Sequence, residues 1–278
     1  MSLKQYNIAE DARDRMLKEN KNFLCIICGG TGSGKTYTGL KLAHQIDPEF
    51  SINRVVFTAK ELMEVLNNGG LRKGSVILFD EAGVGMPARD WYSIQNKLLG
   101  YVLQTFRHRN LGVIFTTPSF DFIDTQARKL FHAYLEPKSI DKVRQQCRVK
   151  LHLLQYNPSS GKIYHKRKKI YDGKKRITIN TLRFNLPPKD LIDAYEAKKD
   201  AFTKKLNKDI LKDLNKKKEK KDKKSFGETL DMVKRNPKKF LSRYGKINPN
   251  LVAAYCGVGN RIGERVATVL NNEKASKH

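Results

Sequence analysis

Residues 29–36, GGTGSGKT, match the Walker A pattern of a phosphate-binding loop. Glycines let the backbone turn its N–H groups towards phosphates, where larger side chains would collide. Lys35 supplies a positive charge for the β- and γ-phosphates, and the Thr36 hydroxyl is a ligand for Mg²⁺. The pattern therefore predicts a nucleotide site formed by Gly29, Gly30, Thr31, Gly32, Ser33, Gly34, Lys35 and Thr36.

Two acids end the apolar run Ser75–Glu81 (SVILFDE). Four apolar residues followed by an acid are typical of a Walker B strand, and Asp80 is the predicted second ligand of Mg²⁺. Glu81 is predicted to activate the attacking water as a general base. The alternative is that Glu81 bonds only to a neighbouring backbone amide. The expected cofactors are therefore ATP and Mg²⁺.

These motifs need strands and helices to position them, and the first half of the sequence alternates the two. Continuous apolar runs predict buried strands over Phe23–Cys28, Asn53–Ala59, Ser75–Glu81 and Leu111–Thr117. Helical spacing predicts helices over Gly34–Ile46, Lys60–Leu66 and Asp90–Arg107. This alternation predicts an α/β fold with a parallel sheet covered on both faces. An acid directly after the Walker B acid indicates the additional-strand class of P-loop ATPases, with Leu111–Thr117 as the additional strand.

Cys25 and Cys28 form a C-x-x-C within the apolar run FLCIIC. Residues i and i+3 of a strand point to opposite faces, so the pair is poorly placed to hold one metal ion. Both are predicted to be buried core thiols.

Polar residues flank the predicted fourth strand. Thr117, at its tip, would lie beside the γ-phosphate and could sense hydrolysis; the alternative is that Thr116 and Thr117 simply end a strand as β-forming residues. Arg107 or Arg109 could reach a neighbouring subunit's nucleotide as an arginine finger. The alternative for these arginines is a basic helix C-terminus that is favourable against the helix dipole.

The pattern changes in the second half of the chain. A P-loop domain over residues 1–186 is expected to contain a β-hairpin insertion at 145–172, around the turn PSSGK. A basic helical linker, 187–224, is expected to follow, and then a small helical unit over 225–278. Strands are predicted over Arg148–Asn157, Ile163–Asp172 and Arg176–Phe184.

The segment LVAAYCGVGNRIGERVATVLNN (251–272) predicts a helix-turn-helix, because two helical stretches flank a Gly-containing turn. Asn260, Arg261, Glu264 and Arg265 would line the start of its recognition helix, where they would meet base edges. Gly263 stands where a branched apolar residue is expected. The alternative is a helical hairpin that contacts another protein.

The charge of the chain is strongly asymmetric. The net charge is +27; residues 1–150 hold 22 Lys+Arg and 15 Asp+Glu, whereas residues 151–278 hold 33 and 13. Such a charge suggests a polyanionic partner, nucleic acid or less often an anionic membrane surface; the alternative is a lysine-rich soluble protein. No stretch approaches the ~20 apolar residues of a membrane helix. A cytoplasmic protein without membrane insertion is therefore expected.

The runs DEAG (80–83) and RHRNLGVIFTTPSFDFID (107–124) resemble the HerA/FtsK superfamily of DNA-pumping ATPases. Arg109, Gly112 and Pro118-Ser119 match that family's pattern. One position departs from it, because Thr117 stands nearest to the family's strand-tip Gln.

The resemblance covers about residues 20–140 and implies a RecA-like core, a hexameric ring of identical subunits and ATP-driven movement of duplex DNA. The short chain is similar to plasmid- or virus-encoded conjugation and packaging ATPases, which implies a recruiting partner protein. One alternative is an ATP-switched DNA-binding partition or transcription regulator. A second is a non-motor assembly protein whose basic tail binds membrane lipid or RNA.

Overall fold

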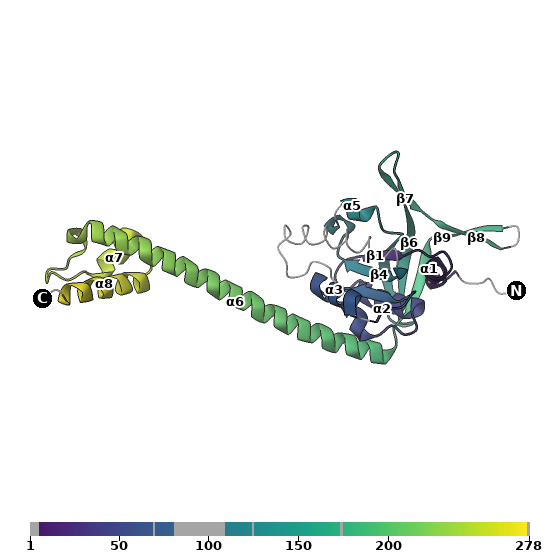
Figure 1. Ribbon diagram of the computed structural model, residues 1–278, viewed down its shortest axis with the longest axis horizontal. Coiled ribbons are helices and arrows are strands. Elements are labelled where there is room, and N and C mark those ends of the chain that lie inside the picture. The colour runs from purple at the N-terminus through teal and green to yellow at the C-terminus, as the bar shows by residue number, and fades with distance from the viewer. Residues whose placement is uncertain (1–5, 69, 81–108, 124, 173–174, 277–278) are drawn as a thin grey trace. The chain divides into compact units, whose positions relative to one another are not determined.

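The structure is a computed structural model, and it describes residues 6–68, 70–80, 109–123, 125–172 and 175–276. The chain divides into two compact units, Met1–Phe202 and Thr203–His278 (Figure 1). The predicted helix Asp90–Arg107 lies outside the described residues, as do Glu81 and Arg107.

The first unit is built on a mostly parallel sheet whose strand order is β10-β6-β5-β1-β4-β3-β2. The pairs β1–β4, β1–β5, β2–β3 and β3–β4 are parallel, whereas β6 is antiparallel to both β5 and β10. β4 lies between β1 and β3, as expected for the additional strand. The bounds are β1 Phe23–Cys28, β2 Val55–Val56, β3 Val76–Phe79, β4 Gly112–Thr117, β5 Ala133–Asp141, β6 Gln146–Asn157 and β10 Thr181–Asn185.

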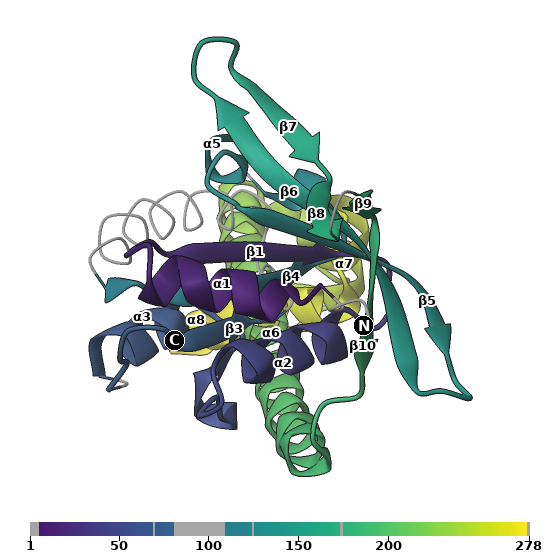
Figure 2. The ribbon, with the colours of Figure 1, turned by 90° about the vertical axis from the view of Figure 1, so that its right-hand side faces the viewer.

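Helices cover both faces of this sheet, so the unit is an α/β structure of three layers. One buried cluster joins the sheet to α1 (Ile8–Leu17), α2 (Lys35–Ile46) and the first turns of α6 (Lys189–Arg235). A second cluster joins the opposite face to α3 (Ala59–Asn68) and α5 (Thr125–Arg128). Figure 2 shows α1 and α2 side by side against the sheet.

β1 shows why continuous apolar strands suit this architecture. All six of its residues are buried, and they alternate between the two clusters. Cys25 and Cys28 are free thiols and belong to different buried clusters. This confirms the prediction that both are buried core thiols. Burial raises the pKa of both thiols, that of Cys28 to about 12.

The strands after β6 are shorter than predicted. Residues 163–172 do not form one strand: β7 (Lys162–Lys166) pairs with β6, and β8 (Lys168–Asp172) pairs with β9 (Lys175–Ile179) in a separate two-stranded sheet. The reason is that β7 and β10 share one edge of β6, β10 along its first half and β7 along its second. The chain between them leaves that edge as the β8–β9 hairpin. Figure 2 shows the β6–β7 end projecting beyond the body of the sheet.

The first unit extends past the predicted boundary at residue 186. α6 begins after Pro188, whose carbonyl accepts the backbone N–H of Ile192 at 3.1 Å. Leu191 and Tyr195 are buried in the α1–α2 face, and the ring of Phe202 stacks on Phe57 at 4.8 Å. The opening turns of α6 therefore belong to the P-loop unit.

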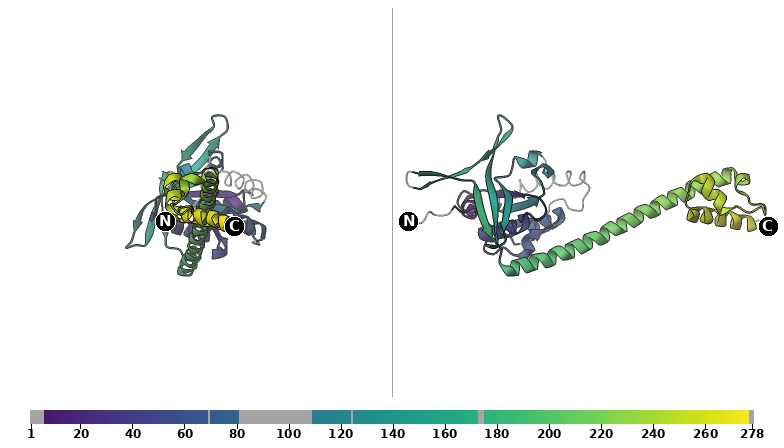
Figure 3. Two further views of the ribbon diagram at one scale, coloured as in Figure 1. Left: turned by 90° about the vertical axis from the view of Figure 1, so that its left-hand side faces the viewer. Right: turned by 180° about the vertical axis from the view of Figure 1, so that it is seen from behind.

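The second unit has a small helical core. The end of α6, α7 (Pro249–Cys256) and α8 (Asn260–Ala275) surround a cluster that includes Val233, Val252 and Val266 (Figure 3). Gly257 ends α7 in the left-handed conformation, with φ of +63°. A Cβ on Gly263 would lie 2.6 Å from the Pro249 carbonyl oxygen, so the helices pack too closely for the branched residue expected there. No described helix is long and apolar enough to cross a membrane.

His132 fastens the start of β5 to β1. Its ring Nδ1 accepts the backbone N–H of Leu24 at 2.9 Å, and its own backbone N–H donates to the Leu24 carbonyl at 2.8 Å. Burial, together with the nearby positive charges of Arg15 and Lys21, lowers the pKa of His132 from 6.5 to about 3. The folded protein therefore holds this ring neutral.

We expect the free energy of unfolding to depend on pH through His132. The lowered pKa means that this contribution is complete above pH 6.5 and is lost as the pH falls towards 3. Between pH 7 and pH 5 the loss is about 2 kcal/mol. Urea unfolding at both pH values should show a smaller loss for His132→Gln than for the parent. An equal loss in both proteins would contradict the role assigned to this ring.

Candidate functional site

The Walker A segment forms the turn between β1 and α2, the place that its sequence predicts. β1 ends at Cys28 and α2 begins at Lys35, with Gly34 as the N-cap. Gly32 and Gly34 have φ angles of +73° and +89°, a region that other residues rarely adopt. A Cβ on Gly29 would lie 2.6 Å from Ser33 Oγ. The loop conformation therefore depends on its glycines.

Two side chains of the loop are arranged as a phosphate site requires. Lys35 is only 8% exposed, and its Nζ donates to the Gly30 carbonyl at 2.8 Å, so its charge lies over the loop. The Ser33 hydroxyl is buried and has no hydrogen-bond partner among the described residues. An anion in the loop would satisfy this hydroxyl and the amides at the start of α2.

Asp80 directly follows β3 and is fully buried. Its Oδ1 accepts hydrogen bonds from the hydroxyls of Thr36 at 2.9 Å and Thr116 at 2.6 Å. Sheet register explains the second contact: Phe79 pairs with Phe115, so the next residues, Asp80 and Thr116, also lie side by side. The Walker A and Walker B motifs are therefore joined by a direct side-chain contact.

The other carboxylate oxygen of Asp80 is bound by α6. Tyr195 donates its hydroxyl to Oδ2 at 2.6 Å, and the Lys199 ammonium lies 3.4 Å from the same atom. Neither residue belongs to a motif that is recognisable in the sequence. The available signal was the spacing of Leu191, Tyr195 and Phe202, which places large side chains on one face of a helix.

These residues fit Mg²⁺ bound together with a nucleotide. Mg²⁺ is commonly held by one or two carboxylates and by phosphate oxygens, with water completing the shell. Asp80 supplies the carboxylate and Thr36 the hydroxyl, beside a loop shaped for phosphate. No group of three or more His, Cys, Asp or Glu residues within the described chain could hold a metal ion alone.

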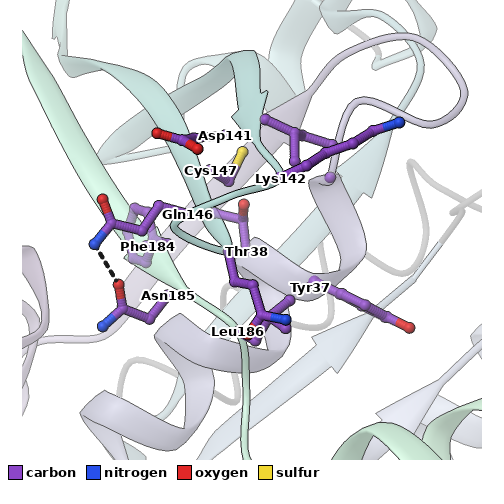
Figure 4. Close-up of a pocket in the computed structure, with 12 residues that line it drawn as sticks. Tyr37, Thr38, Asp141, Lys142, Gln146, Cys147, Phe184, Asn185 and Leu186 are labelled. Atoms are coloured by element: carbon purple, nitrogen blue, oxygen red, sulfur yellow. Dashed lines mark hydrogen bonds between the residues drawn. The ribbon is translucent and has the colours of Figure 1, made fainter.

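Two cavities adjoin the loop and share Gly34, Tyr37 and Ile140 in their walls. One has a volume of about 370 Å³ and extends from the loop to Tyr195 and Lys199. The other has a volume of about 210 Å³ and a mainly apolar wall. In Figure 4, Phe184, Cys147 and the side-chain amides of Gln146 and Asn185 lie around it, and the two amides are hydrogen bonded at 2.9 Å.

The structure places the remaining predicted catalytic residues in different surroundings. Thr117 is buried, but its hydroxyl donates to the Ser119 carbonyl at 3.2 Å; Thr116 is the strand-tip threonine that contacts Asp80. Arg109 donates to the Leu66 carbonyl at 2.5 Å and so holds the end of α3. The sensor role of Thr117 and the finger roles of Arg107 and Arg109 stay predictions.

The predicted DNA-contacting residues lie at the start of α8. Asn260, Arg261 and Arg265 are exposed. The Arg265 guanidinium also lies 4.8 Å from the centre of the Phe226 ring, so part of its role is to pack within the second unit. Arg261 and Arg265 lie four residues apart, which places them on one face of the helix.

Comparison with known proteins gives limited similarity. The chain matches no protein-family model. Uncharacterized protein B-251 of Sulfolobus spindle-shape virus 1 is 29% identical over 106 residues, which cover 34% of this chain and 42% of the viral protein. The N-terminal domain of zonular occludens toxin from Neisseria meningitidis has a TM-score of 0.32 and 19% identity, over 52% of this chain and 94% of that domain.

The two strand-tip threonines can be told apart by their effects on stability. Thr116→Val removes a hydrogen bond to a buried carboxylate and should lower the free energy of unfolding by about 2 kcal/mol. Thr117→Val has the same change of shape but removes only a longer bond to a carbonyl, so a loss below about 1 kcal/mol is expected. Denaturant unfolding measures both, and a reversed order would contradict the assignment.

Proposed function

We propose that this protein is a Mg²⁺-dependent ATPase that drives the movement of duplex DNA. The single observation that carries the ATPase proposal is the contact between Thr36 and Asp80, with Lys35 lying over the same loop. These three side chains meet at the ends of parallel strands, where α/β proteins bind ligands. The position of β4 between β1 and β3 supports the additional-strand class.

The chemistry follows from these positions. The loop amides and Lys35 would bind the phosphates, and Thr36 and Asp80 would hold the metal, which would neutralise the charge of the phosphates. Glu81, next in sequence to Asp80, orients and deprotonates the attacking water. Arg107 or Arg109 of a neighbouring subunit supplies a positive charge to the transition state, in a hexameric ring.

The apolar cavity beside Gly34 suits the nucleobase. It shares part of its wall with the phosphate cavity, and an apolar wall with a few polar groups is typical of sites for small ligands. Phe184 offers a surface for the base, and the amides of Gln146 and Asn185 can donate to and accept from its edge. These amides are the groups that would distinguish adenine from guanine.

The DNA-moving part of the proposal is supported by charge and by the sequence resemblance. Residues 151–278 carry 33 Lys+Arg against 13 Asp+Glu, and Arg261 is exposed at the start of α8. A basic surface of this kind binds phosphates largely independently of sequence. The runs at 80–83 and 107–124 resemble DNA-pumping ATPases.

A DNA-binding switch is the second proposal, favoured by the exposed first turn of α8. It would bind DNA with sequence preference and hydrolyse ATP slowly, whereas a motor would be stimulated by duplex DNA. In an assembly protein, the same basic residues would bind lipid or RNA. Neither sequence-specific DNA binding nor stimulation of hydrolysis by duplex DNA would then be observed.

Two substitutions separate nucleotide binding from hydrolysis. Lys35→Ala should weaken ATP binding by roughly tenfold or more, because it removes a charged contact to the phosphates. Glu81→Gln should keep binding and lose turnover, because only water activation is removed. Calorimetry measures binding and phosphate release measures turnover. Hydrolysis by Glu81→Gln at the parent rate would exclude Glu81 as the base.

DNA binding through α8 can be tested with substitutions at its two ends. Arg261→Ala should weaken binding to duplex DNA and reduce the slope of log affinity against log salt by about one. Lys274→Ala, in the last turn of the same helix, is the charge-matched control and should change affinity less. Equal effects of the two variants in fluorescence anisotropy would show that only overall charge matters.

A further inference from the structure

The first turns of α6 form one wall of the phosphate cavity, although they are far from both Walker motifs in sequence. Tyr195, Glu196 and Lys199 line this cavity together with the loop residues. Glu196 also accepts the hydroxyl of Tyr37, in the first turn of α2, at 3.0 Å. The start of α6 would therefore lie next to a bound nucleotide and its metal.

Within this wall, the positively charged side chain of Lys199 forms an ion pair with Asp80, the acid of the Walker B motif. Its ammonium lies 3.4 Å from Asp80 Oδ2, and its side chain is 28% exposed, whereas that of Asp80 is 0% exposed. A fully buried carboxylate needs a compensating charge. The two groups on Oδ1, from Thr36 and Thr116, are hydroxyls, and so is that of Tyr195 on Oδ2. Among the ion pairs of the described residues, Lys199 is the one that places a positive charge on Asp80.

We propose that Lys199 stands in for Mg²⁺ at Asp80 and leaves this carboxylate when Mg²⁺–ATP binds. The inference rests on the proposed ATPase function. A single carboxylate cannot fully neutralise both the ammonium beside Oδ2 and a divalent ion on the side of Thr36 and Oδ1, because the two cations repel each other at short range. Binding of the metal is therefore coupled to a change in the contacts that hold the start of α6.

The neighbouring contacts determine how large this change is. Lys198 donates to the carbonyls of Val55 at 2.5 Å and Ile52 at 3.2 Å, and Phe202 stacks on Phe57. These contacts do not involve Asp80, so they keep this part of α6 against the sheet after Lys199 has left. The expected response is a loosening of the turn around Tyr195 and Lys199 rather than release of the helix.

The contact between Lys199 and Asp80 links the nucleotide site to the second unit, because both are joined by the same helix. α6 runs from Lys189 to Arg235 and continues past Phe202 into the second unit. When metal and nucleotide bind, the contacts of the first turns of α6 with the sheet change. The same helix continues into the basic part of the protein, so the change can be transmitted along it. Lys199 acts here as a positioning residue.

Metal affinity is the most direct test of this inference. Mn²⁺ binding to the full chain, in the presence of a non-hydrolysable ATP analogue, is measured by electron paramagnetic resonance. Lys199→Met should bind Mn²⁺ about tenfold more tightly than the parent, the factor expected when one charge-assisted contact no longer has to be broken. Lys198→Met is the matched control: it removes the same charge from the adjacent residue, which bonds to carbonyls instead of Asp80, and should leave Mn²⁺ affinity near that of the parent.

Hydrogen exchange of residues 189–202 gives a readout independent of metal affinity. In the parent, adding Mg²⁺ to the analogue-bound protein should speed amide exchange around Tyr195 and Lys199. In Lys199→Met this metal-dependent increase should be lost, because the contact is already absent. If Lys199→Met does not fold, Lys199→Gln keeps a hydrogen-bond donor for Asp80 without the charge and should show the same two effects.

The outcomes separate the inference from the proposed function. If parent and variants bind the analogue and Mn²⁺ with equal affinity, or if Lys199→Met binds Mn²⁺ more weakly, Lys199 does not compete with the metal and the inference is overturned. If Lys198→Met tightens Mn²⁺ binding as much as Lys199→Met, general loosening of α6 is the cause and the inference is again wrong. If no protein binds the analogue at all, the proposed function itself fails.

Discussion

The carboxylate of Asp80 is the constraint on which the P-loop unit depends. It is fully buried, and an isolated charge at such a place would cost several kcal/mol. Within the part of the chain that the structure describes, four side chains compensate for it: Thr36 from α2, Thr116 from β4, and Tyr195 and Lys199 from α6. The carboxylate therefore fastens three elements that are distant in sequence to the end of β3.

This arrangement ties the fold to its chemistry. β4 must lie next to β3 in the observed register for Thr116 to reach Asp80, and the glycines of the loop must turn the chain so that α2 presents Thr36. The opening turns of α6 must then cover the same edge of the sheet. In the proposed function, a metal bound with ATP would change the charge at the point where all of these contacts meet.

The sequence predicts the parts of this site that are local in the chain. The Walker A loop, the strand before it and Asp80 follow from residue types at fixed spacing, and the place of β4 follows from the acid after Asp80. Tyr195 and Lys199 could not be found in this way, because their role arises only when α6 folds back over the sheet, 115 and 119 residues after Asp80. The choice of Thr116 over Thr117 depends on strand register. The break between β7 and β8 depends on which strands share an edge of β6.

If ATP hydrolysis at this site serves the movement of duplex DNA, as proposed, the rate of hydrolysis by the full chain must respond to duplex DNA. The rate is measured with Mg²⁺ at one fixed salt concentration, without DNA and with duplex DNA of unrelated sequences. We expect measurable hydrolysis that becomes faster on every duplex, because the basic surface binds phosphates independently of sequence. No hydrolysis, or a slow rate that duplex DNA leaves unchanged, would contradict it.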